Sequence, residues 1–514
     1  MDKPVESLSL RVLLLQMLAH TLIFLGQNVG NVVERVLLAP DTAACAALGL
    51  SGATFCLFSA FATNVVNVCQ VVTARRGGDG DADGAGTAAR HALVLAGGGG
   101  VIGLAIAAAA GAVATSATGS ARQAALYLAA QGLAVGPHLG AAILMGYFAG
   151  TMRVGPSLTS AVSALCIAVH VALAWTLTSL LEWSLVGAGV ARLGASIALV
   201  LAAIAIARSE VRAIVGSVRR IDWALLWTML TEGSALGLQQ IVAGLMVLLL
   251  YFWAARGGEV TSAALTLTHS GVYPLLFAAA WGSSQAVCTA AALAVGRGNA
   301  RQFSRVVWLG LGLAAIPAFA LPWGAYLLCG RPVLAWLVEG SPAGSSVLMV
   351  SLQFMEWLTI FFVFDFAINY LSALLRAVNE LGYLLKVTAG VAGGFALVNV
   401  ALSLPPDAAH LIGAIITAHA VWALLLLIRV LTRWPGTAKQ DLPAHRTSRS
   451  QGERGGGHGL EPADTRAVLD TGGKRRTPRG KVAGNQKAAF ESLAGRLVKS
   501  INKNESPPQQ GSRR

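Results

Sequence analysis

Charged side chains are scarce in this chain. Asp, Glu, Lys and Arg make up 12% of its 514 residues, whereas hydrophobic residues make up 55%. A soluble domain usually carries about twice that share of charge. The alternation of polar and apolar residues that membrane strands require is also absent. The composition therefore excludes an ordinary soluble domain and predicts helices embedded in a membrane.

Several chemical motifs are missing as well. The chain has no Walker A sequence, no HExxH and no Ser/His/Asp pattern, so we expect neither ATP-driven pumping nor an enzyme. Its six cysteines form no CxxC pair and lie mostly in apolar runs: Cys45, Cys56, Cys69, Cys166, Cys288 and Cys329. We interpret them as small core residues. The sequence predicts no cofactor and no metal site.

What the chain does contain is a series of apolar runs long enough to cross a bilayer as helices. We predict twelve spans, at residues 12–38, 44–72, 92–116, 124–150, 157–181, 184–207, 228–253, 260–294, 305–329, 346–375, 383–403 and 409–432. The second, eighth and tenth exceed the thickness of a bilayer, so tilt or extension beyond it is expected. The first run holds polar residues and lacks a clear cleavage site, unlike a signal peptide.

The basic residues of the loops predict the orientation. With the N-terminus inside, the inner loops hold thirteen Lys/Arg and the outer loops hold four, namely Arg122, Arg192, Arg256 and Arg331. Cytoplasmic loops carry the excess of Lys and Arg in membrane proteins. We therefore expect an integral protein of the plasma (inner) membrane with both termini in the cytoplasm.

Half of the membrane-embedded sequence resembles the other half. Three pairs of segments match: Cys69–Gly77 with Cys288–Gly296, Tyr147–Arg153 with Tyr370–Arg376, and Ala46–Leu50 with Ala263–Leu267. Their offsets are 219, 223 and 217 residues, close to a single register. Each half then has six spans, and both halves enter the membrane from the same side. This predicts two parallel six-helix repeats, over residues 1–220 and 221–435, with a substrate site between them near the bilayer midplane.

Three segments lie outside the spans. Gly77–Thr87 reads as a flexible solvated loop, and Arg208–Trp223 as a connection along the inner interface. The net charge of +14 is concentrated near the end, where residues 433–514 hold 17 Lys/Arg and 7 Asp/Glu. We expect 436–514 to be a disordered basic cytoplasmic tail that meets anionic lipid of the inner leaflet and no nucleic acid. Alternatively, Val482–Asn504 forms an amphipathic helix on that leaflet.

A polar stripe runs along the first span. Its members are separated by 4, 7, 4 and 3 residues and share one helical face: Gln16, His20, Gln27, Asn31 and Glu34. A polar face cannot meet lipid cheaply, so it faces other helices or a water-filled cavity. Glu34 is therefore a candidate for coupling to a cation. Alternatively, it pairs with Arg35 or Arg192 near the outer surface and is structural.

The tenth span carries a second polar face, consisting of Asp365, Asn369, Ser372 and Arg376. Asp365 lies midway along the span among the aromatic residues of Phe361–Phe366. Apolar neighbours disfavour the charged carboxylate by desolvation, which suits Asp365 to bind and release a proton. The alternative is a buried Asp held permanently by a hydrogen-bonding partner. Glu356 falls on the opposite face, near the end of the span.

Other polar residues inside the spans are weaker candidates for lining a cavity: Asn64, Asn67, Gln239, Gln240, His269 and Tyr273. The two glutamines serve equally well to bind a ligand or to hold helices together. We expect His170 to be a helix-packing residue, and Glu232 to reach water at the inner boundary.

The two halves resemble the multidrug and toxic compound extrusion (MATE) family, of the multidrug/oligosaccharide-lipid/polysaccharide (MOP) flippase superfamily. The resemblance covers residues 10–432 and rests on four segments: VVERVLLAPDTAACAALGL at the end of the first span, AAALAVGRGNARQ at 290–302, FAGTMRVGPSL at 148–158 and LSALLRAVNELG at 371–382. Glu34 falls where the family keeps an Asp. Asp365 falls where one branch keeps an Asp implicated in cation coupling.

The chain also departs from the family. In the seventh span, Val242 and Ser234 stand where that branch has a carboxylate and a Pro. In the fifth span, Ala174 and His170 stand where another branch has an acid and an Asn. Two separated carboxylates, one in each half, fit proton coupling better than a sodium site.

The sequence therefore predicts a monomeric antiporter that exports organic compounds. Its expected coupling ion is H+, and Na+ is the alternative. Two carboxylates in a cavity favour cationic, amphiphilic cargo such as drugs or toxic metabolites, with protonation shifting a conformational equilibrium. Gln27, Asn31 and Asn369 would line the cavity with the candidates above. The alternatives are a lipid-linked saccharide flippase of the same superfamily and a non-transporting membrane scaffold.

Overall fold

The computed structural model describes residues 10–38, 42–151, 154–216, 221–339, 344–402 and 408–433. Within these ranges the regular structure is helical and contains no strand. Each of the twelve predicted spans coincides with a helical segment to within one residue or lies inside one. The prediction of an all-α integral membrane protein is confirmed.

The first half contains α1 (Leu10–Leu38), α2 (Thr42–Gly78), α3 (Ala82–Ser116), α4 (Gly119–Thr151), α5 (Pro156–Trp175), the π-helical turn η1 (Thr176–Leu180) and α6 (Ser184–Ile206). A short helix, α7 (Arg208–Gly216), comes next. The second half contains α8 (Trp223–Arg256), α9 (Glu259–Leu265), η2 (Thr266–Val272), α10 (Tyr273–Gly296), α11 (Ala300–Ala325), η3 (Tyr326–Gly330), α12 (Arg331–Leu337), α13 (Gly344–Ala377), α14 (Leu381–Leu402) and α15 (Ala408–Arg433).

Length and composition fit a membrane for most of these helices. Among the described residues, nine helical stretches are apolar and long enough to cross one, and Leu10–Leu25 of α1 is a shorter apolar stretch. Their lipid-facing sides expose large hydrophobic residues such as Leu201, Leu397 and Leu424. Such surfaces are stable in hydrocarbon and would aggregate in water.

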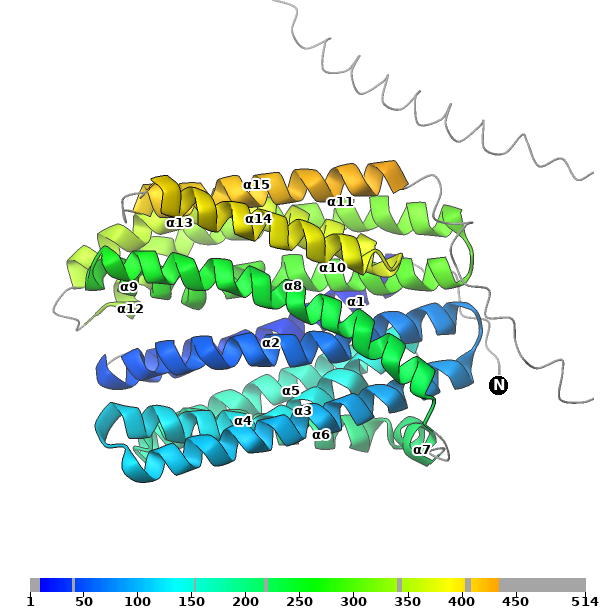
Figure 1. Ribbon diagram of the computed structural model, residues 1–514, viewed down its shortest axis with the longest axis horizontal. Helices are drawn as coiled ribbons and strands as arrows, with labels where there is room; N and C mark the ends of the chain where they lie inside the picture. Colours follow the sequence, from blue (N-terminus) through cyan, green and yellow to red (C-terminus); the bar gives the residue numbers. More distant parts are fainter. Residues whose placement is uncertain are drawn as a thin grey trace, which may run out of the picture. The chain divides into compact units, whose positions relative to one another are not determined.

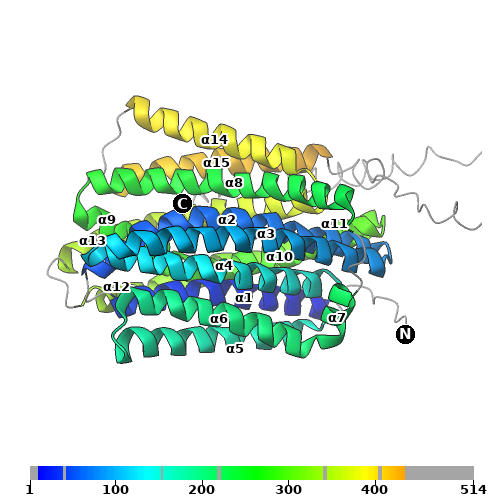
Figure 2. The ribbon, with the colours of Figure 1, turned by 60° about the horizontal axis from the view of Figure 1, so that its bottom comes forward.

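The long helices lie side by side with their axes roughly aligned (Figures 1 and 2). The centre of the bundle is α10, which packs against α1 and α2 of the first half and α11 and α13 of the second. Nearly every residue of α10 from Gly282 to Ala294 is buried, and most are Ala, Ser, Thr or Cys. Small residues allow helix backbones to approach closely, which is how helices associate without a hydrophobic drive in lipid.

The register of the internal repeat is visible directly at this centre. The Gln70 amide of α2 donates a hydrogen bond of 2.5 Å to Thr289 of α10, and these residues are 219 positions apart. That separation equals the offset of the Cys69 and Cys288 segments. Equivalent residues of two repeats meet only where the axis relating them passes. The bundle is therefore built from two parallel six-helix repeats, while the domain boundary at 220 stays a prediction.

One sequence expectation was wrong. Gly77–Thr87 is not a flexible loop, because α2 continues to Gly78 and α3 begins at Ala82. The Asp81 side chain caps α3 by accepting a 2.8 Å hydrogen bond from the Gly84 amide. A capping Asp at a helix start offsets the low helix propensity of the glycines. The connection between the halves contains the helix α7, and the tail predicted at 436–514, with its alternative helix Val482–Asn504, lies outside the described residues.

Candidate functional site

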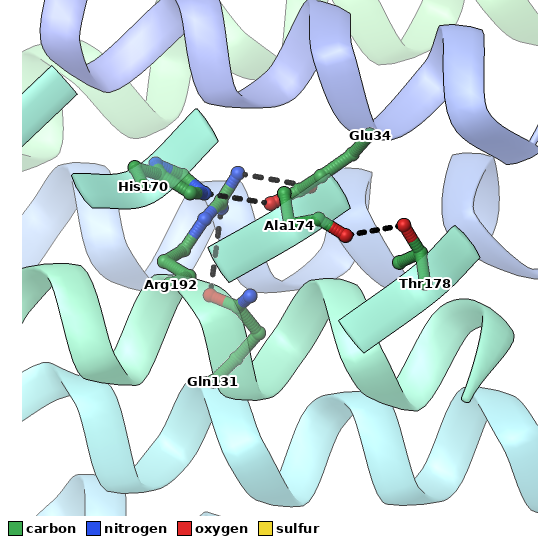
Figure 3. A network of polar contacts seen from close by, with 6 residues as sticks. All are labelled: Glu34, Gln131, His170, Ala174, Thr178 and Arg192. Atoms are coloured by element: carbon green, nitrogen blue, oxygen red, sulfur yellow. Dashed lines mark hydrogen bonds and ion pairs between the residues drawn. The ribbon is translucent and has the colours of Figure 1, made fainter. Parts of the chain in front are cut away.

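Three polar side chains of the first half gather around Glu34 of α1. One carboxylate oxygen of Glu34 lies 3.2 Å from His170 Nε2 of α5, and the other lies 3.3 Å from an Arg192 guanidinium nitrogen of α6. Arg192 also donates to the Gln131 amide oxygen of α4 at 3.4 Å. Figure 3 shows these side chains converging from four helices. We call Glu34, Gln131, His170 and Arg192 the Glu34 cluster.

The ion pair of this cluster is largely buried, which raises the cost of breaking it. The Glu34 side chain is 1% exposed and the Arg192 side chain is 25% exposed. A carboxylate so buried needs a partner, because desolvation of an unpaired charge is costly. The structure thus contains one of the two pairs considered for Glu34, that with Arg192. Protonation of Glu34 would remove the ionic attraction between the two side chains, so the cluster can respond to a proton.

The fifth-span departures from the family pattern lie beside this cluster. His170 is a direct partner of Glu34, whereas Ala174, one turn further, is fully buried and bears no polar group. The Thr178 hydroxyl donates to the Ala174 carbonyl (Figure 3). This bond belongs to the end of α5, where the helix widens into the π-helical turn η1. At the position where another branch of the family has an acid, this chain therefore has an alanine that makes only packing and backbone contacts.

The candidate residues of the second half gather around Asp365 of α13. The Tyr273 hydroxyl of α10 donates to one carboxylate oxygen at 2.5 Å, and the Asn369 amide donates to the other at 2.9 Å. The His269 ring stacks on the Tyr273 ring, with centroids 5.8 Å apart and planes 2° from parallel. The Tyr251 hydroxyl of α8 lies 3.4 Å from His269 Nδ1. We call these five residues the Asp365 cluster.

Aromatic rings enclose the Asp365 cluster. Phe361 and Phe362 of α13 contact Tyr273 with centroid distances of 5.4 and 5.9 Å. Phe361 also meets His419 of α15 at 4.5 Å. No Lys or Arg pairs with Asp365 among the described residues. In contrast to Glu34, Asp365 thus presents a carboxylate whose partners are neutral hydrogen-bond donors within an aromatic wall, an arrangement suited to a proton or an organic cation.

A third polar group joins the two halves at the centre. Gln70 contacts His20 of α1 at 3.4 Å as well as Thr289 of α10. A small pocket opens beside it, lined by Gln16, Ala19, His20, Ile23, Phe148, Ala149, Val154, Pro156 and Thr159. The Gln16 amide oxygen is buried and has no hydrogen-bond partner in the described part of the chain. Gln16, His20 and Glu34 of the first span therefore face the interior, as their periodicity predicts.

The remaining sequence candidates are placed less decisively. The side chains of Gln27 and Asn31 lie outside what the structure describes. Asn64 and Asn67 are half-buried on α2. Gln239 is buried, whereas its neighbour Gln240 is exposed. Cavity lining by these residues stays a prediction.

Sequence reasoning missed two members of the clusters. Gln131 and Tyr251 are single polar residues in apolar helices, and no periodic pattern distinguishes them. The one signal that could have found them was an intramembrane polar residue opposite a candidate acid. Among the described residues no group of three His, Cys, Asp or Glu side chains could hold a metal ion.

Comparisons with known proteins identify the fold. No protein-family model and no curated protein sequence matches the chain. Among solved structures, a MOP superfamily transporter from Pyrococcus furiosus has a TM-score of 0.73 at 19% identity, over 85% of this chain and 100% of that one. A MATE family multidrug resistance transporter in an outward-facing conformation also gives 0.73, at 18% identity over 86% and 100%. The eukaryotic MATE transporter AtDTX14 gives 0.69 at 13% identity over 83% and 96%.

These likenesses define the fold of the chain. The chain is an integral membrane protein with the fold of the MATE/MOP superfamily transporters, which confirms the resemblance drawn from its sequence motifs. At such low identity the likeness extends to the fold and leaves cargo and coupling ion to be argued from the residues.

Proposed function

We propose that this protein is a proton-coupled antiporter of the plasma membrane that exports organic compounds, cationic and amphiphilic ones above all. Both termini face the cytoplasm, and a single chain is the working unit. H+ rather than Na+ is the coupling ion, with no cofactor and no nucleic-acid partner.

The observation that supports this proposal most is the Asp365 cluster. When Asp365 is ionised, it accepts hydrogen bonds from Tyr273 and Asn369. A proton on the oxygen that faces Tyr273 turns that oxygen into a donor and a weaker acceptor, so the bond from the Tyr273 hydroxyl weakens or reverses, with the hydroxyl then accepting. The bond from Tyr273 joins α10 to α13, whereas Asn369 and Asp365 both belong to α13, so a proton that weakens the Tyr273 bond alters the contact between two helices. Cargo binding and proton binding then act on one conformational equilibrium.

The charge of the clusters supports cationic cargo. In the Glu34 cluster the acid is balanced by Arg192. In the Asp365 cluster the acid lacks a basic partner among the described residues and faces aromatic rings. For one of the structurally similar proteins, a MOP superfamily transporter, the reverse polarity of the binding pocket suggests a different function. Cargo charge is therefore the property that a test should vary.

The experiment uses inverted membrane vesicles energised to an acidic, positive interior. A cationic dye is added, and dye-driven proton efflux is recorded for the native chain, Asp365→Asn and Glu356→Gln. Glu356 lies on the same helix and the substitution is chemically equivalent, but its partner is Tyr326 of η3, which is no member of the cluster. We expect Asp365→Asn to abolish efflux and Glu356→Gln to preserve it.

Other results would favour the alternatives. Efflux driven by an anionic dye of similar size, but not by the cationic one, would overturn cationic cargo. Dye movement that occurs only with an imposed sodium gradient would show that the coupling ion is Na+ and not H+. If neither gradient supports movement of any dye, lipid-linked saccharide flipping and a scaffold role become the functions to test.

A further inference from the structure

The two halves meet closely at one end of the bundle, where α2, α10 and α13 all end. A Cβ atom added to Gly296 of α10 would lie 2.0 Å from the Arg75 carbonyl oxygen of α2. A Cβ added to Gly78 would lie 2.4 Å from the Leu293 carbonyl oxygen. Backbone therefore touches backbone between the halves, and no side chain or cargo fits between α2 and α10 here. The loop charges predict that this end faces the cytoplasm.

One side chain crosses from the first half to the second at this end. Arg75 donates from Nε to the Ala377 carbonyl at 3.1 Å and from a terminal nitrogen to the Arg376 carbonyl at 2.6 Å. These carbonyls belong to the last turn of α13, where helical partners run out. The Arg376 carbonyl also accepts a 3.1 Å hydrogen bond from the Asn379 backbone amide, so Arg75 is its second donor. A cation at a helix C-terminus is also favoured by the helix dipole. Arg75 therefore caps a helix of the other half.

The surroundings of Arg75 support a fixed position for its charge. Glu232 of α8 lies within electrostatic range of Arg75. Glu232 in turn accepts a 3.0 Å hydrogen bond from Asn379, which lies just beyond α13 in the left-handed region with φ 64°. The end of α13 and an acid of α8, both in the second half, therefore favour the charge of Arg75 at this position.

The repeat does not provide the reciprocal contact. The residue 219 positions after Arg75 is Ala294, a buried alanine of α10. No symmetry-related arginine can reach from the second half to the first. The neighbouring Arg76 makes a different contact, donating to the Gly84 carbonyl of its own half at 3.1 Å. Among the described residues, Arg75 therefore provides the side-chain bridge at this meeting of α2, α10 and α13.

We propose that Arg75 is the latch of this end: a positioning residue that holds the transporter closed here by capping α13. The inference rests on the proposed transport function, because cargo must pass between the halves. For this end to open, Arg75 must leave both carbonyls. Without the latch, the state open at this end gains population relative to the closed state.

Cys288 supplies a native reporter for this opening. This residue of α10 is 1% exposed and lies within electrostatic range of Arg75 and Arg376. A protein retaining Cys288 as its sole cysteine is prepared in membranes, and its labelling rate with a water-soluble maleimide is measured. Arg75→Gln is compared with the native arginine and with Arg76→Gln, a matched loss of charge one residue away.

We expect Arg75→Gln to accelerate labelling of Cys288 by about tenfold or more, the effect of losing hydrogen bonds from a charged group. Arg76→Gln should leave the rate unchanged. Arg75→Lys, which keeps the charge but loses the fork geometry, should fall between. Removing a nearby cation disfavours the reactive thiolate, so faster labelling would have to come from access.

Global loosening is excluded by a second protein whose only cysteine is Cys166 of α5, a buried residue of the first half. Its labelling should stay slow in Arg75→Gln. An unchanged rate at Cys288, or equal acceleration at Cys166, would overturn the latch. Labelling needs neither cargo nor gradient, so the latch and the proposed antiport can fail separately: accelerated labelling in a protein that moves no dye would contradict antiport alone.

Discussion

At the scale of single residues, the Glu34 cluster combines two requirements that normally conflict. A carboxylate 1% exposed must be compensated, and a coupling carboxylate must be able to change its charge. Arg192 meets the first requirement, and its partial exposure lets it retreat toward water when Glu34 is protonated. The pair is therefore compatible with both the structural and the coupling interpretation of Glu34.

We predict that Arg192→Gln destabilises the protein, because it removes the guanidinium that lies 3.3 Å from the buried Glu34 carboxylate. The expected loss is about 2–3 kcal/mol, below the cost of breaking a fully buried pair because Arg192 is partly exposed. Adding Glu34→Gln should recover much of the loss. Thermal unfolding in detergent measures all three forms, with the exposed Arg122→Gln as a control for loss of charge. Equal stability of Arg192→Gln and the native protein would contradict the pairing.

At the scale of helices, apolar run length predicted all twelve spans, but it missed how their ends are built. The segment Gly77–Thr87 is rich in Gly and Asp, a composition typical of solvated loops. One side-chain bond, from the Gly84 amide to Asp81, is enough to start α3 ten residues before its apolar run. Composition averages over such a contact, whereas capping depends on one residue at one position.

This cap makes a stability prediction. Asp81→Ala removes the acceptor for the Gly84 amide and should cost about 1 kcal/mol, the usual effect of losing an N-cap. Asp81→Asn keeps an oxygen in the same position and should cost a few tenths of that. Unfolding in urea compares the two. A loss as large in the Asn variant as in the Ala variant would show that charge, and not the cap, is what matters at the start of α3.

The π-helical turn η2 is a second feature that hydropathy cannot reveal. It lies inside the predicted span 260–294 and carries His269, shortly before Tyr273. The extra residue of a π-helical turn rotates the remainder of the helix about its axis, and such turns are frequent at functional sites. Tyr273, which pairs with Asp365 92 positions away, is the first residue after this turn. Sequence identified both residues as candidates, but their contact results from the packing of α10 on α13.

At the scale of the whole molecule, the internal repeat was predictable and its asymmetry was not. The offset between Cys69 and Cys288 predicts that α2 and α10 are equivalent, and the bond from Gln70 to Thr289 places them at a common axis. The chemistry of the halves differs, however. One acid is paired with Arg192 and the other is bound by Tyr273 and Asn369. Pairings between helices distant in sequence are set by tertiary packing, so two similar halves acquire different sites.

Deletion of the basic tail distinguishes the transporter interpretation from the scaffold interpretation. Residues 433–514 carry ten of the fourteen net positive charges, so a scaffold that binds anionic partners or lipid would work through them. We predict that deleting 436–514 leaves dye-driven proton efflux unchanged, because both clusters lie in the helical bundle. Efflux is compared in vesicles with matched protein content, with Asp365→Asn in the full chain as the inactive reference. If the deletion abolishes efflux as completely as Asp365→Asn does, the tail takes part in transport, and the bundle alone does not account for the activity.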